Sequence, residues 1–233
     1  MKKKAIAIIT ARGGSKRIPK KNIKEFCGRP IIAYSIDAAL ESKIFDEVMV
    51  STDSQEIAEI AKKYGAEVPF YRSAETSNDT ATTADVLLEV LDTYKKMGQE
   101  FSYMCCIYPT APFVTAGKLQ KAMKVMEEKK PLEIMPVVKF SYPPQRGFVE
   151  NNHGFMEYAH KEYIQTRSQD LQTIYHDAGQ FYIYNVQKYL EVNGKIEADI
   201  VPIKVSELEV QDIDTEDDWK IAEVKYKIMN GSV

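Results

Sequence analysis

Residues 4–17, KAIAIITARGGSKR, join a short apolar run to a basic loop that contains two glycines, an arrangement typical of the first strand of an α/β protein. Residues 4–10 have the length and apolar composition of a buried β-strand. Gly13 and Gly14 end that strand. In α/β proteins, ligands bind at the carboxyl ends of such strands, so the loop that follows is the first candidate for a binding site.

The rest of the chain alternates between strand-like and helix-like spacing of apolar residues. The runs with strand character are 4–10, 47–52, 101–108, 132–138, 181–184 and 200–205. The segments with helical spacing are 32–40 after Pro30, 57–64 before Gly65, 84–94 before Gly98, 118–129, and a last helix that starts at Thr215 with Asp218 as its capping partner. This βαβα order predicts an α/β fold: a mostly parallel, mixed sheet with helices on both faces.

The alternation breaks at about residues 139–178, which contain Pro143-Pro144, Gly147 and no long helical pattern. Two apolar pairs flank residues 151–154 and predict a small hairpin. The segment is too short to bury a core of its own. We therefore expect a single domain over residues 1–233, with an insertion at about 139–178.

Composition places the chain among ordinary globular proteins. Its 233 residues are 44% hydrophobic and 28% charged, and a chain of this length can bury a sizeable core. Three cysteines cannot build a disulfide framework, which favours a reducing cytoplasm. No signal peptide or membrane span is expected from the sequence. The histidines and cysteines show no zinc-ligand spacing, and no nucleophile elbow of a serine hydrolase is present.

The net charge of −3 is unevenly distributed. Residues 1–24 carry nine basic side chains and no acidic one, so the remaining 22 basic and 34 acidic residues leave the rest of the chain at −12. A short basic segment on an acidic protein indicates a local anion site rather than a nucleic-acid surface. Near the other end, residues 207–223 hold eight acidic residues and only Lys220 as a basic one.

The loop 11–22, ARGGSKRIPKKN, has the composition of a phosphate-binding loop. Two glycines allow a turn to expose successive backbone N–H groups to an anion, and Arg12, Lys16 and Lys21 can add charged hydrogen bonds. The loop matches neither a Walker A sequence nor a dinucleotide fingerprint. A solvated basic loop is the alternative, but its place after the first strand favours phosphate binding.

Asp212 and Asp214 are candidate metal ligands. Residues two apart on an extended segment point the same way, and Mg²⁺ is typically held by one or two carboxylates together with substrate phosphates. The alternative is that both residues only precede and cap the last helix. A second polar segment, 71–83, places Thr80, Thr82 and Thr83 at a helix start, where they can contact a ligand or cap the helix.

Taken together, the segments 11–22, 72–83, 108–112 (YPTAP) and 212–214 resemble the acylneuraminate cytidylyltransferase family in order and spacing over essentially the whole chain. The resemblance implies a Rossmann-like fold of the nucleotide-diphospho-sugar transferase type. It also implies CTP and a 2-keto sugar acid as substrates, Mg²⁺ or another divalent cation, and a homodimer whose insertion reaches the partner's active site. No nucleic-acid or membrane partner is expected.

The resemblance also assigns roles to positions of this chain. The expected catalytic residues are Arg12, Lys21, Asp212 and Asp214, of which the two aspartates match the family's metal ligands. The expected nucleotide-binding residues are Ala11, Arg12, Gly13, Ser15, Lys21, Asn22, Arg72, Asp79, Thr80 and Thr83. The expected acceptor-binding residues are Tyr108, Thr110, Gln145, Arg167 and Gln180.

Some positions depart from the members that activate sialic acid. Those members carry Gln-Pro-Thr-Ser-Pro where this chain has Tyr108-Pro109-Thr110-Ala111-Pro112, and a lysine near the position of Gln145. The tract 170–180 is similar instead to the pseudaminic acid cytidylyltransferases. We therefore expect pseudaminic acid as the acceptor, with N-acylneuraminic and legionaminic acids as alternatives.

Two other classes of protein remain open from the residues alone. A metal-dependent glycosyltransferase also pairs a nucleotide site with Asp-x-Asp, but there the aspartates normally follow a central strand. A non-catalytic nucleotide-binding regulator needs the loop but not the aspartates.

Overall fold

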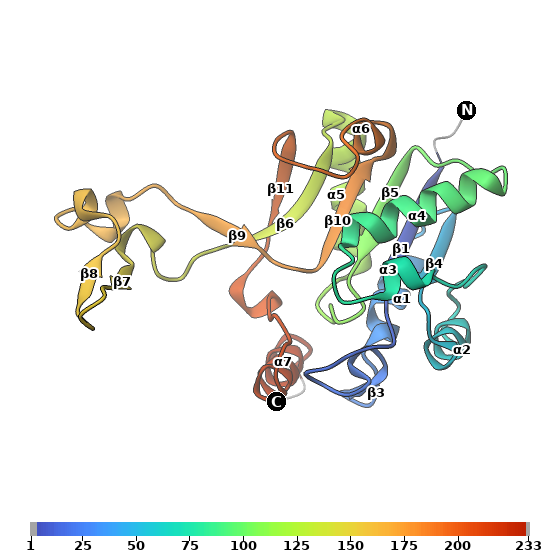
Figure 1. Cartoon of the computed structure of the whole chain (residues 1–233), viewed down its shortest axis with the longest axis horizontal. Helices are drawn as coiled ribbons and strands as arrows, with labels where there is room; N and C mark the ends of the chain where they lie inside the picture. Colours follow the sequence, from blue (N-terminus) through green and yellow to red (C-terminus); the bar gives the residue numbers. More distant parts are fainter. Residues whose placement is uncertain (1–3, 232–233) are drawn as a thin grey trace.

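The computed structural model describes residues 4–231 and confirms the predicted α/β architecture (Figure 1). Within these residues a seven-stranded sheet has the order β11-β6-β10-β5-β1-β4, with β9 paired to β6. Its strands are β1 (Ala5–Thr10), β4 (Glu47–Ser51), β5 (Tyr103–Ile107), β6 (Glu133–Lys139), β9 (Tyr175–Asp177), β10 (Phe181–Asn185) and β11 (Ile200–Lys204).

The sheet is mixed, as expected. β1 runs parallel to β4 and β5, and β6 runs parallel to β11. β10 lies antiparallel between β5 and β6, and β9 is antiparallel to β6. The carboxyl ends of β1, β4, β5, β6 and β11 therefore meet at one edge, where ligands bind in open α/β sheets.

Helices cover both faces of the sheet. One face is covered by α1 (Ile32–Ser42), α2 (Gln55–Lys63) and α5 (Ala116–Lys129), and the other by α4 (Thr83–Lys96) and α6 (Val186–Glu191). The short α3 (Ala74–Ser77) has no buried residue, and α7 (Glu216–Met229) packs in a separate cluster. Alternate residues of β1 point to opposite faces: Ala5, Ala7 and Ile9 pack with α1, α2 and α5, whereas Ile6 and Ile8 pack with α4 and α6. Both sides of β1 are thus buried, as its continuous apolar run predicts.

A third cluster of buried residues joins the two ends of the chain. Ile18 and Phe26, from the region after β1, pack with Ile213 and with Trp219 of α7. The rings of Phe26 and Trp219 meet edge to face with centroids 5.7 Å apart. This packing holds the segment before α7 against the loop that follows β1.

The predicted helix ends agree with the structure in two places and differ in one. Thr215 and Asp218 form the expected capping box of α7, and Gly65 adopts a φ of +90° just after α2. Pro30 is not a first-turn residue. It lies in β3 (Arg29–Pro30), which pairs with β2 (Glu25–Phe26), and α1 begins two residues later.

The insertion projects from the sheet as a separate arm (Figure 1). The expected hairpin is present as β7 (Phe148–Glu150) and β8 (Met156–Tyr158). β9 pairs with the end of β6, so the projecting arm is residues 140–174, shorter than the predicted 139–178. Tyr142 is 87% exposed and Phe155 70% exposed, so the arm leaves large apolar side chains uncovered. Among residues 4–231, none of the helices combines the length and apolar character needed to cross a membrane.

Candidate active site

Two adjoining cavities open at the carboxyl edge of the sheet. The first, here called the basic cavity, has a volume of about 500 Å³, and its cationic lining residues are Arg12, Lys16, Arg17, Lys21 and Arg72. The second cavity, of about 690 Å³, lies between the end of β6, β9 and the segment before α7. Tyr108 and Thr110 line both cavities and so mark the place where they meet.

The glycine loop is held differently from the predicted anion nest. The Gly13 N–H donates to Oδ1 of Asp53 at 2.8 Å, and the Ser15 N–H donates to the Gly13 carbonyl at 3.0 Å. Neither Gly13 nor Gly14 has a positive φ. A Cβ on residue 13 would lie 3.1 Å from Cβ of Ser54, so glycine allows the loop to approach the start of α2 without a shift of Ser54. The prediction that this loop exposes successive N–H groups to an anion is therefore wrong for Gly13 and Ser15, whose N–H groups bond within the protein.

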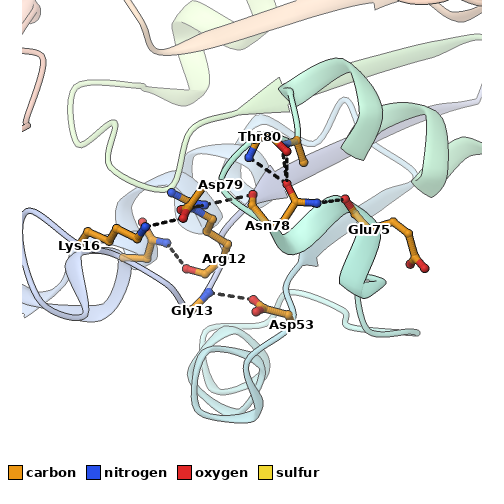
Figure 2. A network of polar contacts seen from close by, with 10 residues as sticks. Arg12, Gly13, Lys16, Asp53, Glu75, Asn78, Asp79 and Thr80 are labelled. Carbon is orange, nitrogen blue, oxygen red and sulfur yellow. Dashed lines mark hydrogen bonds and ion pairs between the residues drawn. The ribbon is translucent and has the colours of Figure 1, made fainter.

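Two cations of this loop converge on one carboxylate (Figure 2). Arg12 donates through Nη1 to Oδ1 of Asp79 at 2.9 Å and to the Asn78 carbonyl at 3.2 Å, and Lys16 pairs with the other Asp79 oxygen. The hydrogen bonds from Lys16 and then Arg12 lower the pKa of Asp79. A pair of cations that meets on a carboxylate can meet on a phosphate in the same way.

Arg72 is the buried cation of the basic cavity. It is 9% exposed and donates through Nε to Oγ of Ser51 at 3.1 Å and through Nη2 to the Ser51 carbonyl at 2.7 Å. Burial lowers its pKa, although the nearby carboxylates of Asp53 and Glu89 oppose this effect. Within residues 4–231 its Nη1 makes no hydrogen bond, so this nitrogen remains for a ligand in the cavity.

The three threonines at the start of α4 make different contacts. Thr82 is the N-cap and forms a capping box with Asp85. The Thr80 hydroxyl donates to Oδ1 of Asn78 at 2.7 Å. Thr83 lines the basic cavity. Thr82 lines the same cavity, so it both caps α4 and borders the site.

Asp212 and Asp214 lie on the segment that precedes α7. Asp212 lines the second cavity. Asp214 pairs with Arg17 at 2.5 Å and lies 3.6 Å from Nζ of Lys21, which also donates to the Ile213 carbonyl at 2.7 Å.

The acidic side chains at this edge fit a divalent cation completed by substrate. In the part of the chain that the structure describes, no group of three or more His, Cys, Asp or Glu side chains is placed to hold a metal. Asp212 and Asp214 supply two carboxylates, and Mg²⁺ commonly takes one or two carboxylates with phosphate oxygens and water. The two aspartates therefore fit a magnesium ion that arrives with a nucleotide.

Tyr108 is fixed at the junction by its backbone. Its N–H donates to the Gln180 carbonyl at 2.9 Å, and its carbonyl accepts from Oγ of Ser35 at 2.8 Å. Its ring packs edge-on against Tyr182 with centroids 5.4 Å apart. Burial raises the pKa of the Tyr108 hydroxyl, which therefore stays neutral near pH 7.

Most predicted site residues meet in these cavities, but some do not. Arg12, Ser15, Lys21, Asn22, Arg72, Asp79 and Thr83 line the basic cavity. Ala11, Gly13, Thr80 and Asp214 line neither cavity, and Ala11 is completely buried. Asn22 also supports the loop, because its Nδ2 donates to the Arg12 carbonyl at 2.9 Å.

Three predicted acceptor ligands lie outside both cavities of this chain. Gln180 is 2% exposed, and its Nε2 donates to the Glu209 carbonyl. Gln145 is buried within the arm, where its Nε2 donates to the Gln172 carbonyl at 2.7 Å. Arg167 is exposed on the arm, 3.6 Å from Asp170. The arm thus carries Gln145 and Arg167 away from the site of their own chain.

Sequence reasoning missed several residues that the fold brings to the site. Asp53 follows β4 and holds the loop through Gly13, and its position at a strand end was the available signal. Asp177 and Lys139 line the second cavity, and Tyr182, expected only as a core residue, lines it as well. β9 was not predicted, so nothing in the sequence indicated where Asp177 lies.

Comparisons with known proteins agree with this geometry. Residues 6–200 match the family model described as Cytidylyltransferase. The chain is 38% identical to the pseudaminic acid cytidylyltransferase of Campylobacter jejuni, over 98% of this chain and 99% of that protein. It is 31% identical to the N-acylneuraminate cytidylyltransferase of Oncorhynchus mykiss, over 95% of this chain but 50% of that protein. A solved structure of a CMP:2-keto-3-deoxy-manno-octonic acid synthetase complexed with CTP superposes with a TM-score of 0.70 at 18% identity, covering 98% of this chain and 99% of the other.

Proposed function

The chain belongs to the cytidylyltransferase family, and from that premise we propose that it joins CTP to a nine-carbon 2-keto sugar acid, giving the CMP-sugar and pyrophosphate. The observation that carries this proposal is the pair of cavities that meet at Tyr108 and Thr110. The basic cavity has the charge to hold a triphosphate, and the second cavity has room for the acceptor. Their junction is where the acceptor hydroxyl would meet the α-phosphate. Family membership also decides against the glycosyltransferase and the non-catalytic regulator.

The chemistry asked of the basic cavity is positioning and charge neutralisation. In-line attack of the anomeric hydroxyl on the α-phosphorus forms a P–O bond and releases pyrophosphate, on which negative charge develops. Arg12, Lys16 and Lys21 line the basic cavity and can bind the departing phosphates, and cations that are already in position stabilise charge that develops in the transition state. Arg72 adds a fixed, buried guanidinium.

Asp212 and Asp214 would hold the divalent cation. When bound, the cation supplies charge neutralisation at the phosphates and lowers the pKa of a bound water or hydroxyl. The segment 212–214 is held against the loop after β1 by Ile213 and Trp219, and the Ile213 carbonyl accepts from Lys21, so the backbone that carries both aspartates stays close to Lys21. We assign no side chain as general base.

Pseudaminic acid is the acceptor that we propose. The chain is more similar to the pseudaminic acid enzyme than to the N-acylneuraminate enzyme in identity and in coverage. Tyr108 offers a ring face and one hydroxyl at the junction, which suits a deoxy, diacylated sugar better than a more hydroxylated one. Sialic acid and legionaminic acid remain the alternative acceptors.

We also propose a homodimer in which the arm of one chain reaches the active site of the other. Gln145 and Arg167 lie on the arm, outside the cavities of their own chain. The arm also exposes apolar side chains such as Tyr142 and Phe155, which a partner chain could bury.

Three free cysteines fit a reducing compartment, and we place the enzyme in the cytoplasm.

Pyrophosphate release tests the proposal directly. The purified chain is incubated with CTP, Mg²⁺ and, in turn, pseudaminic, legionaminic and N-acetylneuraminic acids, and the CMP-sugar is identified by mass spectrometry. We expect release that requires both CTP and a sugar acid, with pseudaminic acid preferred. ATP, GTP or UTP in place of CTP is the control. No product with any of these acids would contradict the proposed function.

A further inference from the structure

Asp177 holds an unusual position in the second cavity. It ends β9, its side chain is exposed, and it lines the cavity beside Gly179 and Tyr182. Both of its oxygens are engaged: Oδ1 accepts from the Gly179 N–H at 2.7 Å, and Oδ2 accepts from the Tyr182 hydroxyl at 2.5 Å. An exposed carboxylate normally moves among several rotamers, whereas this one is fixed from two sides.

Tyr182, which holds Asp177, is itself fixed in the core. It is 6% exposed, and its ring packs edge-on against Tyr108 at 5.4 Å and stacks on Tyr184 at 6.3 Å. Burial, followed by the neighbouring Tyr108 and Asp177, raises the pKa of the Tyr182 hydroxyl. The hydroxyl therefore remains a donor, and Asp177 remains the acceptor. A continuous row of Tyr108, Tyr182 and Asp177 thus runs from the junction into the second cavity.

The cavity has charges of both signs. Asp177, Glu207 and Asp212 bring carboxylates, and Lys139 and Lys225 bring ammonium groups. Lys225 already donates to the Val210 carbonyl at 2.6 Å and the Glu207 carbonyl at 3.2 Å. An acceptor that is an anion is repelled from Asp177 through its own carboxylate, so only a part of the acceptor that offers N–H or O–H donors can face this residue.

We propose that Asp177 is a specificity-determining residue that accepts a hydrogen bond from an N–H or O–H group of the acceptor and thereby orients the acceptor with its carboxylate directed away. Tyr182 is its positioning residue. This inference rests on the proposed function, because it concerns the acceptor of that reaction. It adds a role for a side chain that neither the sequence reasoning nor the family resemblance assigned.

The test compares Asp177→Asn with the parent and with Glu207→Gln. Asparagine keeps the shape of the side chain but has one acceptor oxygen for two protein donors and the acceptor sugar. Glu207→Gln is the matched control, since it removes another carboxylate that lines the same cavity. The readouts are kcat and KM for the sugar acid at saturating CTP, sugar-acid affinity by calorimetry, Kd for CTP, and Tm.

We expect Asp177→Asn to lower kcat/KM for the sugar acid about 10- to 100-fold, the usual effect of losing a charged hydrogen bond. In Asp177→Asn, Kd for CTP should change less than about twofold, because the lost hydrogen bond concerns the sugar acid only. In Glu207→Gln, kcat/KM for the sugar acid should fall less than about threefold. Tyr182→Phe should lower kcat/KM by a smaller factor, and the double variant should be no worse than Asp177→Asn alone, as expected for two residues that act as one unit.

Three outcomes would overturn the inference. One is a parent-like kcat/KM for the sugar acid in a folded Asp177→Asn protein. Another is an equal loss in Glu207→Gln, which would show a general effect of charge. The third is an Asp177→Asn protein whose affinity for CTP and whose Tm fall along with its kcat/KM for the sugar acid, which would show a structural role. A parent protein that neither binds nor converts any sugar acid would overturn this inference and the proposed function together, whereas an active parent with one of the three outcomes overturns the inference alone.

Discussion

Replacing Arg72 with methionine should separate the stability of the fold from the binding of CTP. Arg72 is 9% exposed, and within residues 4–231 it forms no salt bridge: the hydrogen bonds of its side chain go to Ser51 alone. Burial of an unpaired guanidinium costs several kcal/mol after relaxation. Two charged hydrogen bonds return about 1.5–3 kcal/mol each. These contributions nearly cancel, so the charge adds little to the stability of the protein.

The groups left behind by Arg72→Met can be satisfied. The Ser51 carbonyl still accepts from the Ala11 N–H at 3.0 Å, and the Ser51 hydroxyl can rotate to another partner. Methionine fills most of the volume and adapts to irregular space. We expect the free energy of unfolding to change by no more than about 1–2 kcal/mol, in either direction.

Catalysis should respond very differently. A fixed cation beside the phosphates contributes about 3–4 kcal/mol to the transition state, so kcat/KM for CTP should fall about 10²- to 10³-fold. Arg72→Lys keeps the charge, but a single ammonium group cannot reproduce the two-nitrogen contact of the guanidinium with Ser51. Its kcat/KM should lie between that of the parent and that of Arg72→Met. Urea unfolding and initial rates of pyrophosphate release measure the two effects. A loss of more than about 3 kcal/mol in stability with unchanged kcat/KM per folded molecule would refute this reasoning and mark Arg72 as structural.

Four further predictions follow from the site and the core. Asp214→Ala should abolish turnover and leave Tm nearly unchanged. Its affinity for CTP in the absence of metal should be equal to that of the parent or higher, because Arg17 and Lys21 lose a competing carboxylate. Turnover at high Mg²⁺ equal to that of the parent would contradict a role in metal binding. Mixing inactive Arg167→Ala and Asp214→Ala proteins, with subunit exchange, should restore about a quarter of the parent activity, because half of the dimers then hold one intact site; activity that stays absent after exchange, shown by mass spectrometry, would contradict an active site shared between chains. Tyr108→Gln should reduce the preference for the diacetamido acid over sialic acid by about 1–3 kcal/mol, measured as the ratio of specificity constants, and an unchanged ratio would limit Tyr108 to packing. Burial raises the pKa of Glu133 to about 7, so the stability that its protonated form provides is present at acidic pH and is lost as the pH rises through 7. The free energy of unfolding of Glu133→Gln, measured in urea, should therefore rise by about 1–2 kcal/mol relative to that of the parent between pH 5 and pH 8. A difference between the two proteins that does not change with pH would disprove this prediction.

The elements that sequence patterns predicted correctly are those whose signals are local. β1 is a continuous apolar run because α1, α2 and α5 cover one face of the sheet and α4 and α6 the other. α7 begins where the spacing of Thr215 and Asp218 placed it, because a capping box lies within four consecutive residues. The cations of the loop 11–22 were also visible, since charge needs no fold to be recognised.

The elements that sequence patterns missed depend on distant partners or are too short to show a period. β9 is exposed along its length and has no apolar alternation, and it exists because it pairs with the end of β6. α6 has six residues after its cap Asn185, fewer than two helical turns. Asp53 and Asp177 were missed for a related reason. Each accepts a hydrogen bond from a backbone N–H, and only the folded chain defines where that N–H lies.

The unequal charge of the two ends of the chain has a structural explanation at this site. The basic residues that follow β1 meet the acidic residues that precede and begin α7: Arg17 pairs with Asp214, and Lys24 pairs with Glu216 at 2.6 Å. The buried contact of Ile213 and Trp219 with Ile18 and Phe26 brings these segments together and keeps them there. In the proposed reaction, a triphosphate between these segments would meet cations on one side, and a divalent cation bound with it would meet carboxylates on the other. Because each charged segment has the other as its partner, the ion pairs between them offset the repulsion that either segment would create alone, and binding of a charged ligand would exchange one set of ion pairs for another.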